Sequence, residues 1–140
     1  MFNLYGNLTS LDNYISTFSV DGKYSHMFEN TNVYDCSKFN TGIKTFDAGT
    51  FEAFAYMFSN CKYLVKVPKL PATTLGMSCY SHMFSGCTLL TTIPSDLLPG
   101  TTLSWSCYEN MFSGCTSLTT IPSNLLPATT LANNCYDSMF

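Results

Sequence analysis

Apolar residues recur along the chain in blocks that repeat at a nearly constant interval. Six of the seven methionines precede a phenylalanine, and successive Met-Phe pairs are 26, 30, 26, 28 and 28 residues apart. The last copies are almost verbatim, since Cys79-Tyr-Ser-His-Met-Phe-Ser-Gly-Cys87 recurs as Cys107-Tyr-Glu-Asn-Met-Phe-Ser-Gly-Cys115. A fixed period of about 20 to 50 residues is typical of stacked repeats. The sequence therefore predicts one stack of about five coils, over residues 1–26, 27–56, 57–82, 83–110 and 111–138.

Each copy contains two patterns that predict secondary structure. In Cys-Tyr-x-x-Met-Phe-x-x-Cys the apolar residues form one stripe of a 3.6-residue period, which predicts an amphipathic helix of about two turns. Gly86 and Gly114 lie near its end, where glycine commonly stops a helix. The segments 90–94 and 118–122 both read Leu-Thr-Thr-Ile-Pro, and β-branched residues before a closing proline predict a very short strand.

The rest of each copy reads as a returning arc with a Leu-Pro pair and a Thr-Thr-Leu triplet. The copy that starts at Met57 lacks two residues between its first and second prolines, so we expect this arc to tolerate insertion. Both Met1-Phe2 and Met139-Phe140 fall inside repeats, and neither end reads as a cap. We therefore expect an excerpt of a longer protein, or ends covered by a partner.

The segment Met-Phe-Ser-Gly-Cys-Thr-Ser-Leu-Thr-Thr-Ile-Pro at 111–122 resembles a known repeat. It is similar to the Ala-Phe-x-x-Cys-x-x-Leu-x-x-Ile-x-Ile-Pro repeat of the BspA-like leucine-rich-repeat surface proteins, but lacks one Ile-x step. The resemblance covers residues 57–140 well and 1–56 loosely. It implies an α/β fold, namely a right-handed leucine-rich-repeat-like solenoid with short parallel strands and short helices. It also implies an adhesion role at the cell surface, although the N-terminus lacks a secretory signal. Similar repeats occur in gut-phage proteins, where a virion component needs no signal.

The composition excludes several classes of partner. Charged residues make up 11% of the chain, against about 25% in an ordinary domain. The net charge is −3, there is no arginine, and all six lysines lie between residues 23 and 69. Nucleic-acid binding and binding to anionic membranes both depend on clustered basic residues, so neither is expected. No apolar run is long enough for a transmembrane helix, so membrane insertion is not expected.

The cysteines and histidines suggest packing rather than catalysis. Cysteines recur at two positions of the repeat. We interpret them as small buried hydrophobic residues, with disulfides between coils as the alternative. The first position holds Cys79, Cys107 and Cys135, the second holds Cys61, Cys87 and Cys115, and Cys36 belongs to neither. No Cys-x-x-Cys motif predicts a zinc site. His26 and His82 occupy a position that varies between copies, which indicates a solvated face. We predict no catalytic residue, no metal and no cofactor, and hence no enzyme.

Four residues are candidates for ligand binding. Lys66, Thr92 and Thr120 lie between the apolar anchors of the predicted strands, and Trp105 occupies a position that holds Met77 in another copy. The Met, Phe and Tyr stripe is predicted to be core. The sequence favours a recognition or adhesion module that binds a surface glycan or protein through a repeated Thr/Ser-rich face. The alternative is a structural spacer or phage virion building block, whose open ends self-associate or pack on partner subunits. We expect a location at the cell surface or outside the cell as part of a longer protein, or in a virion.

Overall fold

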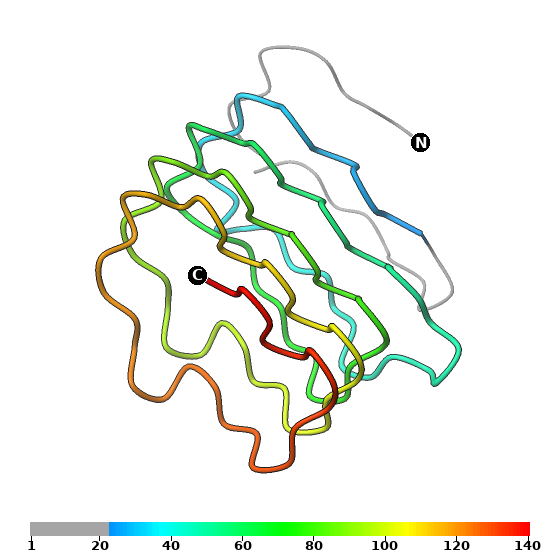
Figure 1. The fold of residues 1–140 in the computed structure, drawn as a ribbon. Helices are drawn as coiled ribbons and strands as arrows, with labels where there is room; N and C mark the ends of the chain where they lie inside the picture. Colours follow the sequence, from blue (N-terminus) through cyan, green and yellow to red (C-terminus); the bar gives the residue numbers. More distant parts are fainter. Residues whose placement is uncertain (1–22) are drawn as a thin grey trace.

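The structure, a computed structural model, describes residues 23–140 as a stack of coils that lie side by side along one axis (Figure 1). The first predicted coil, 1–26, falls almost entirely outside the described residues. Each coil has two parts. We call the segments 24–30, 52–60, 78–86, 106–114 and 134–140 the turn ladder, and the segments 31–51, 61–77, 87–105 and 115–133 between them the arcs.

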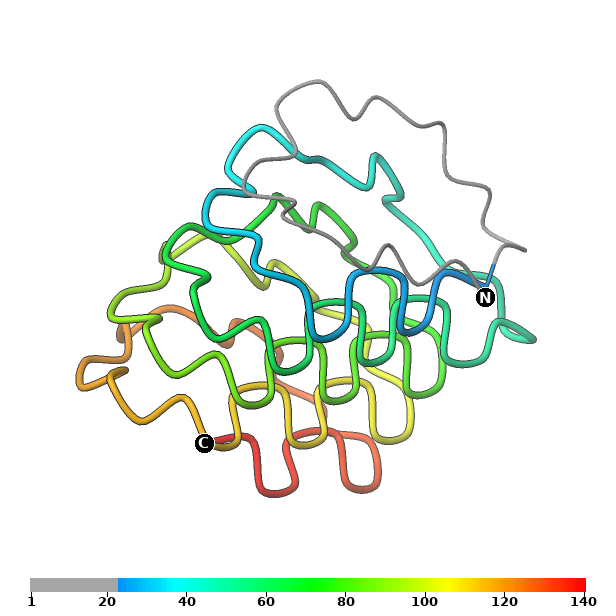
Figure 2. The same ribbon diagram turned by 90° about the horizontal axis from the view of Figure 1, so that it is seen from above.

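The predicted helices are wrong, because residues 23–140 contain no helix. The turn ladder is a series of tight turns, which appear as a square zigzag in Figure 2. Every second residue donates its backbone N–H to a carbonyl in the next coil, as in Tyr80 N to Cys107 O at 3.0 Å and Phe84 N to Met111 O at 3.0 Å. The residues between them donate within the coil, as in Met83 N to Tyr80 O at 3.2 Å. The backbone hydrogen bonds thus join coils rather than successive helical turns.

The backbone conformation explains why no helix forms. Every fourth residue of the turn ladder has a positive φ; in one coil these are Ser78 (52°), His82 (56°) and Gly86 (74°). An α-helix requires negative φ throughout, and a positive φ costs a residue with a Cβ about 1–2 kcal/mol. A turn that repeats every four residues still places apolar residues at the first, fifth and ninth positions on one side. That pattern closely resembles the 3.6-residue period of a helix, and this is why the sequence pattern predicted a helix that the structure does not contain.

The predicted strands are also wrong, since no described residue belongs to a strand longer than a single bridge. Segments 90–94 and 118–122 contain no bridge. Five isolated parallel bridges occur instead, mostly where the second and third coils meet; they are Asp35–Lys66, Asn40–Lys69, Thr45–Thr74, Phe51–Met77 and Thr74–Thr102. The right-handed α/β leucine-rich-repeat-like solenoid is therefore overturned, and the stack is built from turns and extended arcs.

The core is a set of identical side chains stacked from coil to coil, which confirms the predicted apolar stripe. Phe28, Phe58, Phe84 and Phe112 are all fully buried or nearly so, and their rings stack with centroids 5.4, 5.8 and 5.6 Å apart. Tyr80 and Tyr108 stack in a parallel row, and Met57, Met83 and Met111 are buried beside them. Burying one such side chain contributes about 1.5–3 kcal/mol.

The cysteines are free thiols and all seven are buried, which confirms their interpretation as small core residues and excludes disulfides in this structure. Three of them also donate a hydrogen bond to a backbone carbonyl of the preceding coil. The thiol of Cys61 donates to Phe28 O at 3.1 Å, that of Cys87 to Phe58 O at 3.3 Å, and that of Cys115 to Phe84 O at 3.1 Å. Each bond joins one coil to the preceding coil at the place where the turn ladder passes into an arc.

Candidate recognition surface

The four predicted ligand-binding residues do not gather in one place. The Lys66 ammonium lies 3.0 Å from Asp35 in the preceding coil, in an ion pair that also follows a backbone bridge. Thr92 and Thr120 are exposed, but they lie in segments without any bridge to a neighbouring coil. Trp105 lies at the far end of its arc, next to the turn ladder, and it is 59% exposed. Trp105 is therefore an exposed aromatic side chain and not a packed edge residue.

Trp105 belongs to a row of exposed apolar side chains that we call the apolar column, namely Phe51, Met77 and Trp105. Phe51 and Met77 form a parallel bridge, and Ser78 N donates to Trp105 O at 2.9 Å, so the three residues occupy one register on consecutive coils. Their side chains are 45%, 37% and 59% exposed. Single exposed apolar residues are ordinary, but an aligned row is typical of an interaction surface.

Sequence reasoning found only part of this column. Met77 and Trp105 each lie six residues before a Met-Phe pair, and the same offset from Met57 gives Phe51. The copy around Phe51 lacks the Leu-Pro-Ala-Thr-Thr-Leu segment, and for this reason the equivalence of Phe51 to Met77 and Trp105 was not recognised. Counting back from each Met-Phe pair was the signal that would have identified Phe51.

A row of threonines accompanies the apolar column, and we call Thr45, Thr74 and Thr102 the threonine row. Parallel bridges join Thr45 to Thr74 and Thr74 to Thr102. Thr101 N and Thr102 N both donate to Thr73 O at 3.0 Å, which holds the two Thr-Thr-Leu triplets in register. A repeated hydroxyl-bearing row therefore exists, but Thr45 and two Thr-Thr-Leu triplets form it, and not the segments around Thr92 and Thr120.

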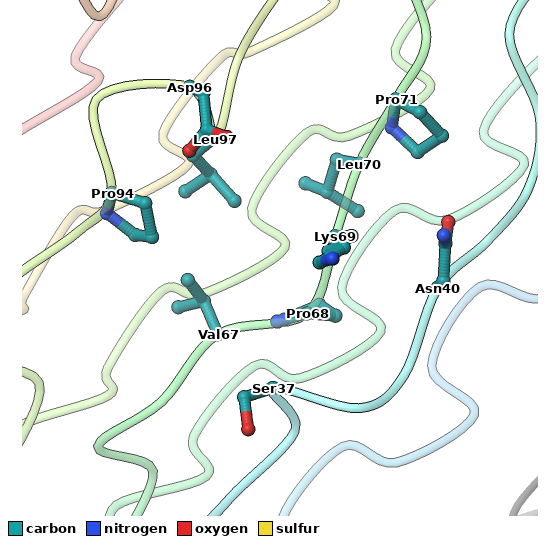
Figure 3. Close-up of a pocket in the computed structure, with 10 residues that line it drawn as sticks. All are labelled: Ser37, Asn40, Val67, Pro68, Lys69, Leu70, Pro71, Pro94, Asp96 and Leu97. Atoms are coloured by element: carbon teal, nitrogen blue, oxygen red, sulfur yellow. The ribbon is translucent and has the colours of Figure 1, made fainter.

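A separate pocket of about 270 Å³ lies on the arcs of three consecutive coils (Figure 3). Prolines and aliphatic side chains form most of its lining, and four polar residues complete it; the lining is Ser37, Asn40, Val67, Pro68, Lys69, Leu70, Pro71, Pro94, Asp96 and Leu97. It lies where the arc 61–77 is two residues shorter than the arc 87–105. The shorter coil leaves a notch between its longer neighbours. The notch is smaller than the about 300–1,000 Å³ of ordinary ligand pockets.

The thiols are chemically protected by the core. Burial raises the pKa of Cys107 and of Cys115 to about 11, and burial likewise raises the thiol pKa of Cys36, Cys61 and Cys87. The thiolate is the reactive form, so these side chains are poor nucleophiles near neutral pH. Within residues 23–140, no group of three or more His, Cys, Asp or Glu side chains could hold a metal ion.

The histidines form a stack on the outside of the turn ladder. The rings of His26 and Tyr56 have centroids 4.7 Å apart, and those of Tyr56 and His82 are 4.4 Å apart. His26 Nδ1 lies 2.7 Å from Glu29, and His82 Nδ1 lies 2.8 Å from Ser81 Oγ. Partial burial raises the pKa of Tyr56, and the nearby carboxylates, first Glu52, add to this effect. The Ser81 hydroxyl is buried, so this pair offers no accessible nucleophile.

No protein family, no curated protein and no solved structure matches this chain. The resemblance to BspA-like repeats stays a prediction from sequence, and the α/β architecture that it implied is wrong. No helix in residues 23–140 is long and apolar enough to cross a membrane.

Proposed function

We propose that the chain is a non-enzymatic recognition module that binds a surface glycan or protein through the apolar column and the threonine row. The alignment of Phe51, Met77 and Trp105 on three consecutive coils carries the proposal, because it places three exposed apolar groups where one ligand can contact them together. Binding energy at such surfaces is concentrated in a few residues, with tryptophan strongly enriched among them. This role belongs at the cell surface, outside the cell or on a virion.

The test compares three versions of the chain on a panel of immobilised surface glycans and extracellular proteins. The wild-type chain should bind at least one member, and Trp105→Ala should weaken that binding about tenfold. Leu89→Ala is the matched control, because Leu89 is 47% exposed and lies outside the column. If the wild-type chain binds nothing, or if both variants bind as the wild type does, the proposal is wrong.

A second candidate function is structural, as a spacer or virion building block that packs on a partner subunit. It is supported by the last described coil, where Leu131 is 64% and Phe140 is 56% exposed. A hollow of about 210 Å³ beside Phe140 is lined by Phe112, Leu118 and Cys115. Size-exclusion chromatography with light scattering, with and without reductant, tests this role. Defined oligomers that persist in reductant and dissociate in Leu131→Asp support it, whereas a stable monomer contradicts it.

A further inference from the structure

We infer that the ligand of the apolar column is an uncharged, extended polysaccharide that lies along the stack axis, across the coils. This inference rests on the proposed function and names the ligand class of the same site. The geometry is the first argument. Phe51, Met77 and Trp105 lie on consecutive coils at one register, and neighbouring extended chains are about 4.8 Å apart. The three side chains therefore form a line about 10 Å long, suited to a chain ligand rather than a compact one.

The chemistry of the line matches a sugar chain. A sugar ring has an apolar face of C–H groups and a rim of hydroxyls. The apolar face packs on an indole or phenyl ring, and Trp105 and Phe51 offer these rings at the two ends of the line with the flexible Met77 side chain between them. The hydroxyls need donors and acceptors. Exposed Thr102 and half-buried Thr74 lie three residues before Trp105 and Met77, and their side chains supply both.

The charge around the column favours an uncharged ligand. Gly76 and Ser78 flank Met77, while Ser104 and Ser106 flank Trp105, so no basic side chain is adjacent in sequence to either residue. The nearest acidic neighbour in sequence is Glu52, which is exposed beside Phe51. A carboxylate there repels acidic or sulfated polysaccharides, and recognition of such anions depends on lysine and arginine.

The width of the surface distinguishes a glycan from a protein partner. A stable protein–protein interface buries about 800 Å² on each side, with an apolar centre several residues wide. The apolar column is one residue wide, and apart from Glu52 its immediate neighbours in sequence carry hydroxyls or no side chain. A narrow apolar line with a hydroxyl margin fits a single polysaccharide chain.

Tryptophan fluorescence tests the inference directly, because Trp105 is the only tryptophan of the chain. The probes are uncharged oligosaccharides of glucose, mannose and N-acetylglucosamine, each from the monosaccharide to the hexasaccharide. At least one series should shift the Trp105 emission to shorter wavelength, and its affinity should increase with length until the oligomer spans the three side chains. Oligogalacturonate and heparin fragments are the charged comparison and should bind more weakly.

The variants separate this inference from the proposed function. Met77→Ala and Phe51→Ala should each weaken binding of the longer oligomers several-fold and leave the shortest almost unaffected, whereas Leu89→Ala should change neither. If no uncharged oligosaccharide shifts the emission, or if affinity does not depend on length, the inference is wrong. In that case a protein ligand from the panel above, lost in Trp105→Ala, would still support the recognition module. Tighter binding of the charged oligomers would also overturn the inference.

Discussion

The turn ladder and the arcs differ in both regularity and length. Each complete segment of the turn ladder spans nine residues (52–60, 78–86 and 106–114), and every second N–H group in it pairs with the next coil. The arcs span 21, 17, 19 and 19 residues (31–51, 61–77, 87–105 and 115–133). Backbone hydrogen bonds join the first three arcs to one another, but none joins the arc 87–105 to the arc 115–133. All variation in the repeat length therefore falls in the arcs. The turn ladder joins every pair of neighbouring coils in the same way, whereas the pairing of the arcs changes along the stack.

This division explains where the candidate sites lie. The proline-lined notch, the threonine row and the apolar column all belong to arcs. Function is commonly carried by connecting segments on a rigid scaffold, because these segments tolerate changes in length and sequence. The following predictions test whether stability resides in the turn ladder and its core, and whether the arcs are indeed free to change.

The largest expected effect is the loss of the whole stack at alkaline pH. Burial raises the pKa of at least six thiols in the folded chain; they are Cys36, Cys61, Cys79, Cys87, Cys107 and Cys115. The folded chain then keeps protons that the unfolded chain releases above its thiol pKa of about 8.5. Stability is therefore fully present below that pH and decreases above it, by about 1.4 kcal/mol per thiol for each pH unit.

Since a domain is stable by only about 5–15 kcal/mol, we expect unfolding by about pH 10 to 11. Circular dichroism across pH 7 to 12, in reductant, measures the transition. A chain in which Cys61, Cys87 and Cys115 are replaced by alanine loses three of these thiols, and if it folds, its transition should move to higher pH. A transition that stays in place contradicts the prediction.

The next effect is truncation of the core beneath the turn ladder. Phe84→Ala removes a fully buried ring that stacks on Phe58 and Phe112, and it should lower the free energy of unfolding by about 3–5 kcal/mol. Leu89→Ala, in the arc of the same coil, should cost less than about 1 kcal/mol because Leu89 is exposed. Urea titration measures both. Similar losses from the two variants would contradict the assignment of stability to the turn ladder.

A smaller loss of stability should follow from substitutions at positions where the backbone has a positive φ. Gly86 has a φ of 74°, and a Cβ there would meet the Asn60 side chain, so Gly86→Ala should cost about 2 kcal/mol. Gly49 lies in an arc with nothing within 4 Å of an added Cβ, and Gly49→Ala should leave stability within about 0.5 kcal/mol of the wild type. Thermal unfolding of the pair distinguishes the two regions. Equal melting temperatures would show that the turn ladder does not depend on this backbone geometry.

The smallest effect should follow from lengthening the short arc. Insertion of Ser-Asp between Lys69 and Leu70 gives the arc 61–77 the length of its neighbour 87–105 and should fill the proline-lined notch. Stability should change by less than about 1 kcal/mol, because lengthening a loop is inexpensive. Urea titration measures the change, and a crystal structure shows the pocket. The same insertion between Met83 and Phe84 is the control and should prevent stacking. A large loss of stability from the insertion in the arc would contradict the conclusion that the arcs tolerate changes in length.

The sequence predicted the repeat and the core, because these depend on which residues recur. It did not predict the backbone. The positions 0, 1, 4, 5 and 8 in Cys-Tyr-x-x-Met-Phe-x-x-Cys suit both a helix and a four-residue turn. The sequence carried only a partial signal for the turns, because Asn or Gly occupies some of the positions where φ is positive, as at Asn60, Gly86, Asn110 and Gly114, but Ser, His, Glu or Tyr occupies the others. Glycine and asparagine adopt this conformation more readily than other residues.

The candidate site was half predictable for a similar reason. Trp105 could be recognised alone, because it stands at a position that the core does not demand. Lys66, Thr92 and Thr120 were assigned on the assumption that 90–94 and 118–122 form a strand wall, and without strands that wall does not exist. The threonine row depends on which arcs bridge to each other. This pairing is a property of three neighbouring coils together, so the sequence of a single copy does not predict it.

The one-way pairing of the turn ladder has an electrostatic consequence. In each segment of the turn ladder, every second N–H group points toward the next coil and the accepting carbonyl points back, as from Phe54 to Cys79 and from Tyr80 to Cys107. Each peptide carries a dipole of about 3.5 D, so the aligned groups add to a dipole along the stack with its positive end at the C-terminal coil. The fixed charges have the opposite arrangement. Residues 23–69 hold six lysines and four carboxylates, and residues 70–140 hold no lysine and three carboxylates. The negative charge of the last coils therefore lies near the positive end of this dipole, where it is stabilised, as a carboxylate is at the N-terminus of a helix.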